Sequence, residues 1–532
     1  MTTLRRILAA ACALAAAALM GGCASLPPPP APQPPTHAIE DGARTFLGKM
    51  AAKGAPATKD GSAPLSGFRL MPEAAFAFDA RIALARNAEK SLDVQYYLIE
   101  KDDVGLLLLK ELREAAERGV RVRLLVDDLY AGGEDELFNT FAAFPNVEVR
   151  LFNPLPSRAS ALPVRLALSL HDFKRINHRM HNKLMVADNS FAISGGRNIA
   201  NDYFMRSTAA NFIDLDVVSS GPVVHELSNA FDMYWNSEFV WPIQSVAPMS
   251  MTSETARRRF DEIVRAAVPD VPLRARDVLG NSPLGEELVT GRIERHWATS
   301  KVFADSPAKI TRKPEDAYRG SVTEGALGVI STAKTKVVIA SPYFIPGPIG
   351  MAMMKEQIGN GVNVTVVTNS LGSTDEPLAY AGYERYRADM LKIGVTIYEI
   401  APQYSARSKR FGEFGKSISR LHAKLANIDG KRFFVGSMNL DHRSAAVNTE
   451  LGLVIDNDLL VAEYTDYVRG TGADGEDDLG YRLRLTPDGR RTEWLEYNDQ
   501  GGDIVHADVP GEFLWLRFKS WLLLPVVGED LL

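Results

Sequence analysis

Apolar and polar positions change along this chain in blocks that predict strands and helices in turn. Three continuous apolar runs are typical of strands buried on both faces of a sheet: 91–99, 119–126 and 147–152. Between the first two, residues 106–118 have apolar positions at helical spacing. Counterparts of the three runs lie in the second half of the chain: 336–345, 361–368 and 395–400. The pattern predicts an α/β fold of two similar halves, each a mixed β-sheet flanked by helices.

The same pattern divides the chain into five segments. They are a leader (1–22), a proline-rich tether (23–65), a first half (66–239), a helical connector (240–319) and a second half (320–532). In the connector we expect helices at 254–267 and 285–296. The second half contains an acidic, glycine-rich insertion near 470–480, then two short strands and an apolar stretch at 513–527. That last stretch fits a helix on a bilayer surface or one docked on the core.

The pattern His-x-Lys-x-x-x-x-Asp occurs twice. Its residues are His181, Lys183 and Asp188 in the first copy, and His422, Lys424 and Asp429 in the second. A turn and an asparagine follow each copy: Gly195, Gly196 and Asn198, then Gly436, Ser437 and Asn439. Every matched position is displaced by the same 241 residues. We interpret the two copies as a duplicated unit whose halves meet at a shared active site.

The residue types of the motif suit phosphodiester chemistry. Residues two apart in a strand share one face, so each His projects with its Lys, and a hairpin turn at Asp188 or at Asp429-Gly430 brings the asparagine back. Lysines and asparagines can hold the anionic oxygens of a phosphodiester. One histidine can attack phosphorus while the other moves protons. Lysine is a poor divalent-ion ligand and no carboxylate cluster accompanies it, so we expect neither a metal nor another cofactor.

Four carboxylates and a serine are expected to support the site. A histidine that does this chemistry needs an acceptor on its other ring nitrogen, and the candidates are Asp214, after the first motif, and Glu450, after the second. Asp188 and Asp429 are expected to cap the hairpins and tie loops together. Ser437 supplies a hydroxyl donor that Gly196, its counterpart, lacks.

The beginning of the chain predicts export. Arg5 and Arg6 precede a short apolar run that ends at Cys23, which looks like a bacterial lipobox. A plain signal peptide or an uncleaved anchor is the alternative. Acylation of Cys23 predicts a membrane-anchored lipoprotein that faces the periplasm, and resemblance to enteric lipoproteins favours the outer membrane. Removing the leader leaves one of the two cysteines, so no disulfide is expected.

Charge argues against nucleic acid as a partner. The formal charge is −6, and losing Arg5 and Arg6 with the leader makes it −8. Basic residues gather just before each motif: Lys174, Arg175, His178 and Arg179, then Arg407, Lys409, Arg410, Lys416 and Arg420. Single runs of this kind are usually solvated loops. Two runs in equivalent places favour a positive rim around an anionic substrate.

With these motifs the chain resembles the phospholipase D superfamily, and more closely the bacterial cardiolipin synthases of the C type. The shorter strings that support the closer likeness are 91–97, 179–183, 195–199, 304–307 and 436–440. The resemblance implies a duplicated fold with the active site between its halves and a phosphatidyl-enzyme intermediate. It implies phospholipid substrates at a membrane surface, with phosphatidylglycerol first among them and phosphatidylethanolamine as a second candidate. It also favours His181 as the nucleophile and His422 as acid and base.

Three functions stay open at this point. A membrane-facing phosphatidyltransferase that makes cardiolipin is the leading hypothesis. A hydrolytic phospholipase D, or less plausibly a nuclease, would use the same residues, because water access alone separates hydrolysis from transfer. A non-catalytic lipoprotein that binds anionic lipid is the remaining alternative. The sequence indicates no oligomeric state.

Overall fold

The computed structural model describes residues 25–28, 34–57, 64–268, 273–403, 417–469, 480–496 and 502–511. The predicted leader, Cys23, the acidic insertion up to residue 479 and the apolar stretch at 513–527 lie outside these residues, as does the second basic run apart from Arg420. Among the described residues no helix is both long and apolar enough to cross a bilayer.

The first half contains one mixed sheet. Its strands are β1 (Ser66–Met71), β2 (Ser91–Tyr96), β3 (Arg121–Asp127), β4 (Val147–Phe152), β5 (Leu184–Ala187), β6 (Phe191–Gly195), β8 (Asp216–Ser220) and β9 (Val240–Pro242). They are ordered β9-β4-β3-β2-β5-β6-β8-β1, with β2, β3 and β4 parallel. Its helices are α3 (Ala74–Asn87), α4 (Asp103–Glu117), α5 (Asp135–Phe141), α6 (Leu162–Ser169), α7 (Phe173–Ile176) and α8 (Pro222–Trp235), and α2 (Phe46–Ala52) precedes them.

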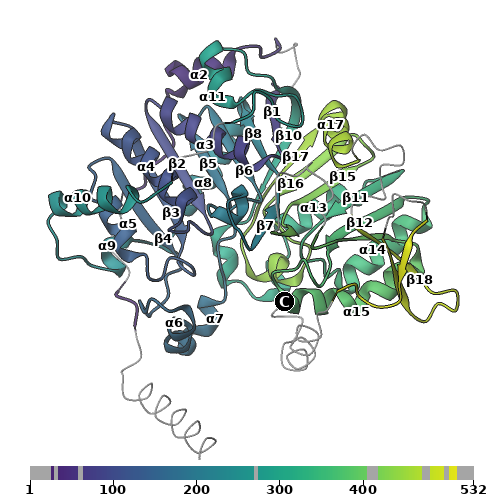
Figure 1. The fold of residues 1–532 in the computed structure, drawn as a ribbon. Coiled ribbons are helices and arrows are strands. Elements are labelled where there is room, and N and C mark those ends of the chain that lie inside the picture. The colour runs from purple at the N-terminus through teal and green to yellow at the C-terminus, as the bar shows by residue number, and fades with distance from the viewer. Residues whose placement is uncertain are drawn as a thin grey trace, which may run out of the picture.

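The second half repeats this arrangement. Its strands are β11 (Lys336–Ala340), β12 (Asn363–Asn369), β13 (Thr396–Ile400), β15 (Lys424–Ile428), β16 (Arg432–Gly436), β17 (Leu451–Asp456), β18 (Tyr481–Leu485), β19 (Thr492–Glu496) and β20 (Ile504–His506). The order β13-β12-β11-β15-β16-β17 matches β4-β3-β2-β5-β6-β8, with the same strands parallel. Its helices are α12 (Pro314–Ala317), α13 (Val322–Ile330), α14 (Gly347–Gly359), α15 (Pro377–Ile393) and α17 (Asp458–Arg469). The predicted fold class is therefore confirmed (Figure 1).

The connector is less helical than its pattern predicts. It contains α9 (Ile243–Val246), α10 (Ser253–Val264) and α11 (Leu284–Thr290), and then the strand β10 (His296–Ala304). The expected helix at 285–296 is wrong beyond Thr290, because Gly291 takes a left-handed conformation there and ends it. Strand β10 pairs with β17 and with β1, so it joins the two sheets. Its pairing partners come from both halves, which local periodicity does not reveal.

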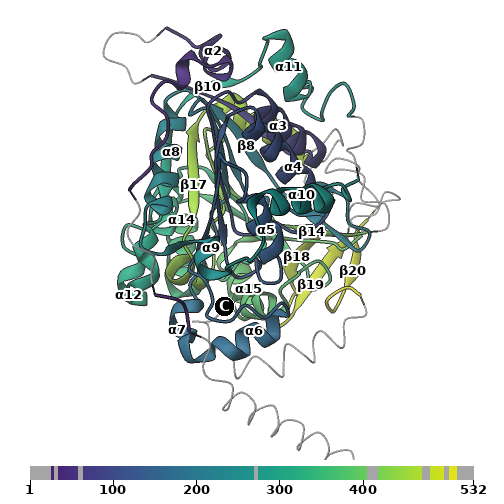
Figure 2. The same cartoon turned by 90° about the vertical axis from the view of Figure 1, so that its left-hand side faces the viewer.

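Three apolar clusters hold these layers together. In the first half, α3, α4 and α5 pack on β2 and β3. In the second, α13, α14 and α15 pack on β11 and β12. The third cluster is shared: it contains α8, β5 and β8 from the first half and β15, β16 and β17 from the second. The inner faces of the two halves therefore pack against each other, which agrees with their side-by-side arrangement in Figures 1 and 2.

The two motif aspartates tie equivalent hairpins to equivalent strands. Asp188 and Asp429 both lie in turns with positive φ, and strand pairing on either side forms the two predicted hairpins. The carboxylate of Asp188 accepts hydrogen bonds from the backbone N–H groups of residues 89, 90 and 91. The carboxylate of Asp429 accepts them from residues 334, 335 and 336. Each aspartate thus fixes the start of β2 or β11, and neither contacts the motif histidines.

Replacing Asp429 with alanine is expected to lower the free energy of unfolding by about 1–2 kcal/mol, because three backbone N–H groups lose their acceptor. Partial burial raises the pKa of Asp429, but the N–H groups of Lys336, Thr335 and Lys334 lower it more, from 3.8 to about 2. A carboxylate whose folded-state pKa is lowered stabilises the fold above its unfolded pKa, and this contribution disappears as the pH falls from about 4 to about 2. Denaturant unfolding at pH 6 and pH 2.5 checks this: an equal difference between wild type and variant at both pH values contradicts it.

Candidate active site

Two short parallel pairings between the halves bring each motif beside the opposite half. In the first, β14 (Ile418–Leu421) pairs with β7 (Ala210–Ile213), and Leu421 lies opposite Ile213. In the second, Met180 lies opposite Thr449. Met180 and Leu421 directly precede the motif histidines, whereas Ile213 and Thr449 directly precede the two predicted orienting carboxylates. The backbone therefore places each histidine next to the carboxylate of the other half.

The side chains complete these crossed pairs. The Nδ1 atom of His181 lies 2.9 Å from a carboxylate oxygen of Glu450, and that of His422 lies 2.7 Å from one of Asp214. Along the sequence each carboxylate follows the histidine of its own half, so the structure exchanges the partners. A carboxylate accepts hydrogen bonds, so each Nδ1 donates and each Nε2 keeps its lone pair. All four side chains are buried.

The first pair is a neutral imidazole held by an ionised carboxylate. Burial lowers the pKa of His181 to about 4; Glu450 opposes that shift, and Lys183 lowers the pKa further. Burial by itself would raise the pKa of Glu450, but His181, Lys183 and the hydroxyl of Ser437 lower it overall. At neutral pH the Nε2 atom of His181 is therefore unprotonated and fixed in direction, as a nucleophile requires.

The second pair lies in the same charged cluster. Burial lowers the pKa of His422 well below 6.5, and Lys424, Lys183 and His181 lower it further. His181, which belongs to the other half, is therefore near enough to His422 to interact with it electrostatically. Burial raises the pKa of Asp214, and Lys424 opposes that shift. The two pairs are therefore alike in geometry but differ in how strongly their carboxylates are held ionised.

Both motif lysines are fixed by their own histidines. The Nζ atom of Lys183 donates to the carbonyl of His181 at 2.7 Å, and that of Lys424 donates to the carbonyl of His422 at 2.5 Å. Lys183 also lies over the ring of Tyr97, which packs edge-on against His181. Burial lowers the pKa of Lys183 well below 10.5 and that of Lys424 to about 8. Nearby carboxylates, Glu450 and Asp214 among them, oppose these shifts without reversing them, so a phosphate would be a favourable additional counter-charge.

The two asparagines also lie close to the opposite pairs. The amide of Asn198 donates to the hydroxyl of Tyr203, and the ring of Tyr203 packs edge-on against His422. The backbone N–H of Asn439 donates to Ser444, whose hydroxyl also binds the carboxylate of the first pair. Each asparagine keeps a buried side-chain oxygen that has no hydrogen-bond partner within the described part of the chain. Such atoms are unfavourable unless a ligand or water satisfies them.

Sequence reasoning missed a second equivalent pair that positions the motifs. Asp127 accepts the backbone N–H of Met180 at 2.8 Å. Asn369 accepts the backbone N–H of Leu421 at 2.7 Å and donates to its carbonyl. Both residues end equivalent parallel strands, β3 and β12. The repeat alignment of 119–126 with 361–368, extended by one residue, is the signal that could have revealed them.

Asp305 is another supporting residue without an assigned role in the sequence, although it lies in one of the family-like strings. Its carboxylate accepts the backbone N–H of Glu450 at 3.0 Å and pairs with Lys309 at 2.7 Å. Its own N–H donates to the carbonyl of Glu450 at 3.0 Å. Asp305 therefore fixes the backbone that carries the carboxylate of the first pair.

The predicted positive rim is wrong for Arg179, the last residue of the first basic run. Arg179 is buried and pairs with Asp127 at 3.0 Å. Arg175 donates to the neighbouring Asp172 at 2.7 Å, and only Lys174 is exposed among these three basic residues. A buried guanidinium needs a counter-charge, and both arginines are used to hold the chain that leads into the motif. Positive charge at the site comes instead from the motif lysines.

The glycine in the first half makes room for a carboxylate. A Cβ atom placed on Gly196 would lie 2.1 Å from a carboxylate oxygen of Asp214. In the second half the equivalent Ser437 donates its hydroxyl to Glu450 at 2.5 Å. The longer side chain of Glu450 contacts its histidine with a serine beside it. The shorter side chain of Asp214 lies closer to the backbone, where only a glycine leaves enough room. The loss of the serine in the first half therefore has a steric reason.

We expect Gly196→Ala to lower activity by about 10²-fold, because the added methyl group displaces Asp214 from His422. Gly328→Ala is the matched control, since a Cβ there has no neighbour within 4 Å. Initial rates and thermal unfolding of the two variants measure the effect. An active Gly196→Ala enzyme with wild-type rates contradicts the steric argument.

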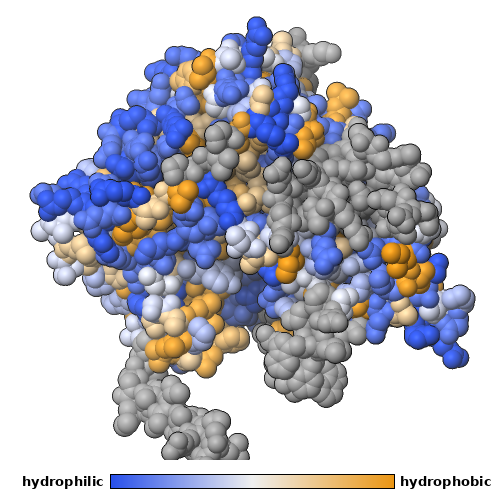
Figure 3. Space-filling view, viewed as in Figure 1, coloured by the Kyte–Doolittle hydropathy of each residue, from blue (hydrophilic) through white to orange (hydrophobic). Residues whose placement is uncertain are grey.

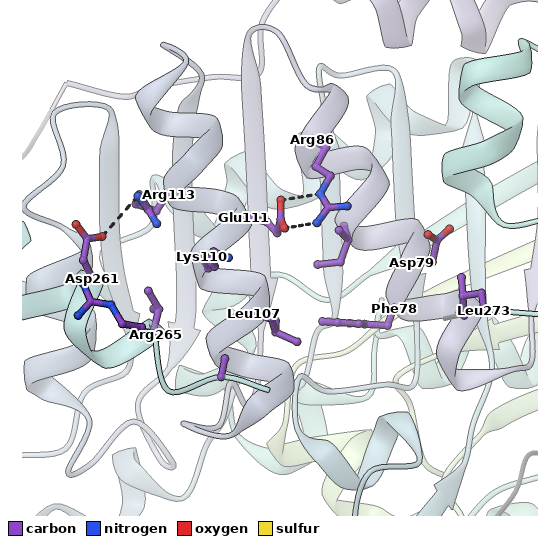
Figure 4. Close-up of a pocket in the computed structure, with 13 residues that line it drawn as sticks. Phe78, Asp79, Arg86, Leu107, Lys110, Glu111, Arg113, Asp261, Arg265 and Leu273 are labelled. Carbon is purple, nitrogen blue, oxygen red and sulfur yellow. Dashed lines mark hydrogen bonds and ion pairs between the residues drawn. The ribbon is translucent and has the colours of Figure 1, made fainter. Parts of the chain in front are cut away.

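A separate cavity lies on the outer side of the first half. It has a volume of about 730 Å³ between α3, α4 and α10 (Figure 4). Two ion pairs line it: Arg86 with Glu111 at 2.9 Å and Arg113 with Asp261 at 3.6 Å. None of the motif residues lines it. We therefore assign the chemistry to the crossed pairs and not to this cavity.

Comparisons with known proteins agree with this geometry. A family described as "Cardiolipin synthase, PLD-like domain" matches residues 82–235 and 327–470, one range in each half. Cardiolipin synthase C of Escherichia coli K12 is 36% identical over 455 residues, which make up 85% of this chain and 93% of that protein. Cardiolipin synthase 2 of Staphylococcus epidermidis is 25% identical over 379 residues, 71% of this chain and 62% of that protein.

A solved structure shares the fold. The phosphatidylserine synthase of Haemophilus influenzae Rd KW20 aligns with a TM-score of 0.53 and 12% identity, covering 88% of this chain and 96% of that one. The duplicated halves, the paired motifs and the family match over both halves lead to one assignment. The chain belongs to the phospholipase D superfamily of phosphatidyltransferases and phosphodiesterases, in the family of cardiolipin synthases with a phospholipase D-like domain.

Proposed function

We propose that this protein transfers a phosphatidyl group between phospholipids through a covalent phospho-histidine and so makes cardiolipin. The observation that carries the proposal is the pair of crossed histidine–carboxylate contacts, which provides two oriented imidazoles for one phosphorus atom. The names of the relatives support the reaction class. Phosphatidylglycerol is the acceptor, because its headgroup carries the free hydroxyl and the glycerol that join the two halves of cardiolipin. The donor is a second phosphatidylglycerol, which loses glycerol, or a phosphatidylethanolamine, which loses ethanolamine.

In the first step the Nε2 atom of His181 attacks phosphorus and the bond to the headgroup oxygen breaks. His422, which the negative charge of the bound phosphodiester helps to protonate, gives its proton to that oxygen, and the headgroup alcohol leaves. In the second step His422 takes the proton from the hydroxyl of the acceptor, whose oxygen attacks phosphorus while the phosphorus–nitrogen bond breaks. Lys183 and Lys424 would stabilise the negative charge on the equatorial oxygens in both steps.

The two supporting carboxylates favour this division of roles. Glu450 accepts three side-chain hydrogen bonds and has a lowered pKa, so it holds His181 in one tautomer throughout. Asp214 accepts one side-chain bond, from His422, and burial raises its pKa. A carboxylate with the higher pKa tolerates changes in the charge of its imidazole more readily, which suits the residue that gains and loses a proton.

An apolar groove next to the site supports a lipid substrate. It has a volume of about 430 Å³, begins at Leu440 directly after Asn439, and runs between α13 and α14. Its lining includes Leu327, Phe344, Ile345, Met353 and Met354. Such a lining can accommodate an acyl chain but offers little to a nucleic acid, which is bound by cations and stacking surfaces.

The proposal is tested with purified protein and phosphatidylglycerol vesicles, with and without phosphatidylethanolamine, in the presence of EDTA. Cardiolipin formation supports transfer. Phosphatidic acid as the sole product would establish the hydrolytic alternative. Absence of any product, with His181→Ala and His422→Ala behaving like wild type, would leave lipid binding without catalysis.

We further propose that the protein works in the cell envelope as a lipoprotein anchored through Cys23 and facing the periplasm, in the outer membrane. The leader, the cysteine at its end and the absence of aspartate after it support this location. Mass spectrometry of the N-terminal peptide from isolated membranes tests it. An unmodified Cys23, or an intact leader, would exclude the anchor.

Activity is expected to decline above about pH 8. Burial lowers the pKa of Lys424 to about 8, so its positive charge is lost above that pH and the phosphate is held less well. We expect kcat/KM to fall about tenfold per pH unit there. The Lys424→Arg variant, although slower, should decline less steeply above pH 8, because a guanidinium keeps its charge and only Lys183 still titrates. A wild-type profile that is level to pH 10 contradicts this assignment.

A further inference from the structure

The segment α6–α7 has its polarity reversed relative to a water-facing helix. Its outward side chains include Val164, Leu170 and Phe173, which are 50%, 60% and 46% exposed. Its inward side chains include Arg165 and Ser169, both 0% exposed. Water would favour the opposite arrangement, because exposed apolar side chains lose the stabilisation of burial and a buried arginine must find partners.

The unfavourable burial of the Arg165 guanidinium is offset by hydrogen bonds, which also hold the segment in place. The guanidinium donates to the carboxylate and carbonyl of Asp128, to the carbonyl of Leu129 and to the carbonyl of Ser157. Arg158 binds the same carboxylate at 2.7 Å. Hydrogen bonds on the inner side of the segment therefore hold its apolar side chains at the surface.

These contacts connect the segment to the side of the active site on which Tyr130 is exposed, which we call its mouth. Tyr130, the residue after Leu129, is 44% exposed and packs edge-on against Tyr97. Tyr97 in turn packs edge-on against His181. A chain of neighbouring groups thus runs from the reactive imidazole to the surface beside α6. At its C-terminal end, the segment leads into the first motif.

The exposed surface combines apolar and basic residues. Figure 3 shows hydrophobic side chains gathered over α6 and α7, and these helices lie at one end of the molecule in Figures 1 and 2. Lys174 is exposed next to Phe173, and His171 is exposed next to Leu170. Apolar side chains next to a lysine are a composition that inserts into the headgroup region of an anionic bilayer.

We infer that the α6–α7 segment is a docking surface that inserts Val164, Leu170 and Phe173 into an anionic phospholipid bilayer and sets the mouth of the active site against it. The inference rests on the proposed function, since it identifies the surface from which the substrate lipid is taken. It concerns the described fold alone and does not depend on acylation of Cys23.

One test compares two forms of the same substrate. The triple variant Val164→Glu, Leu170→Glu, Phe173→Glu is expected to lose at least about tenfold in rate on phosphatidylglycerol vesicles, and to keep the wild-type rate on dihexanoyl phosphatidylglycerol dissolved as monomers. The matched control is Val289→Glu with Leu459→Glu, two exposed apolar residues of α11 and α17, which lie at the opposite end in Figure 1. Equal losses on both substrates, or none on vesicles, would overturn the inference.

A second test needs no activity. A polarity-sensitive fluorophore is attached to the Leu170→Cys variant of the full chain, and the labelled protein is reconstituted into phosphatidylglycerol vesicles. The signal from the labelled chain without this substitution is subtracted. The emission is expected to shift to the blue at position 170 and not at Val289→Cys. The absence of a shift at position 170 would overturn docking. A shift that occurs without vesicles and depends on protein concentration would also overturn it, because it would indicate contact with a second copy of the chain. If wild type turns over neither substrate, the proposed function fails while this test still decides docking.

Discussion

Alanine at His181 or at His422 is expected to lower phosphatidyl transfer by at least about 10⁴-fold. In the proposed mechanism no covalent intermediate forms without His181, and the leaving alkoxide is not protonated without His422. Both side chains are buried in one cluster, and each Nδ1 is already committed to a carboxylate. No other histidine of the described chain takes part in these pairs. Initial rates on phosphatidylglycerol vesicles measure the loss.

The double variant is expected to be no slower than either single variant, because the two histidines act as one unit. His225→Ala is the matched control, since His225 is an exposed histidine of α8. Thermal unfolding of all four proteins separates loss of chemistry from loss of fold. Losses that add in the double variant would mean that the histidines serve two independent sites.

Converting the orienting carboxylates to amides is expected to cost about 10³-fold each, through Glu450→Gln and Asp214→Asn. An amide has nearly the same shape, but its NH₂ group can face Nδ1 and favour the wrong imidazole tautomer. Glu111→Gln is the matched control: Glu111 is a buried glutamate that pairs with Arg86 on the outer side of the first half. Retention of wild-type rates by either amide variant contradicts the orienting role.

The crossed arrangement predicts that these two variants fail at different steps. Glu450→Gln disables the nucleophile, so rapid quenching should capture little phospho-histidine. Asp214→Asn slows proton transfer by His422 in both steps, so phospho-histidine on residue 181 should form slowly and, once formed, persist. Acid-labile phosphate on the peptide that contains residue 181 is the measurement. The reverse pattern would assign the nucleophile to His422.

Much of the framework follows from local sequence. The apolar run at 147–152 becomes β4 with the same bounds, and the returning strands after both turns become β6 and β16. Asp429-Gly430 forms the hairpin that its composition indicates, because both residues readily adopt positive φ. The equal spacing of the two motifs anticipates a duplicated fold, since each copy directs the same strand and turn. These features depend on neighbours within a few residues.

What the sequence could not decide depends on contacts between distant segments. The exchange of Glu450 and Asp214 between the histidines follows from the two parallel pairings at Met180 and Leu421, and no local pattern encodes which segments pair across halves. Which charged side chains are exposed also depends on distant contacts. The sequence places Arg179 in a basic run that we expected to be exposed, but its side chain is buried and pairs with Asp127. Composition and spacing determined the chemical groups and their duplication. Only long-range strand pairing, and the burial it creates, determined which groups touch and which side chains face water.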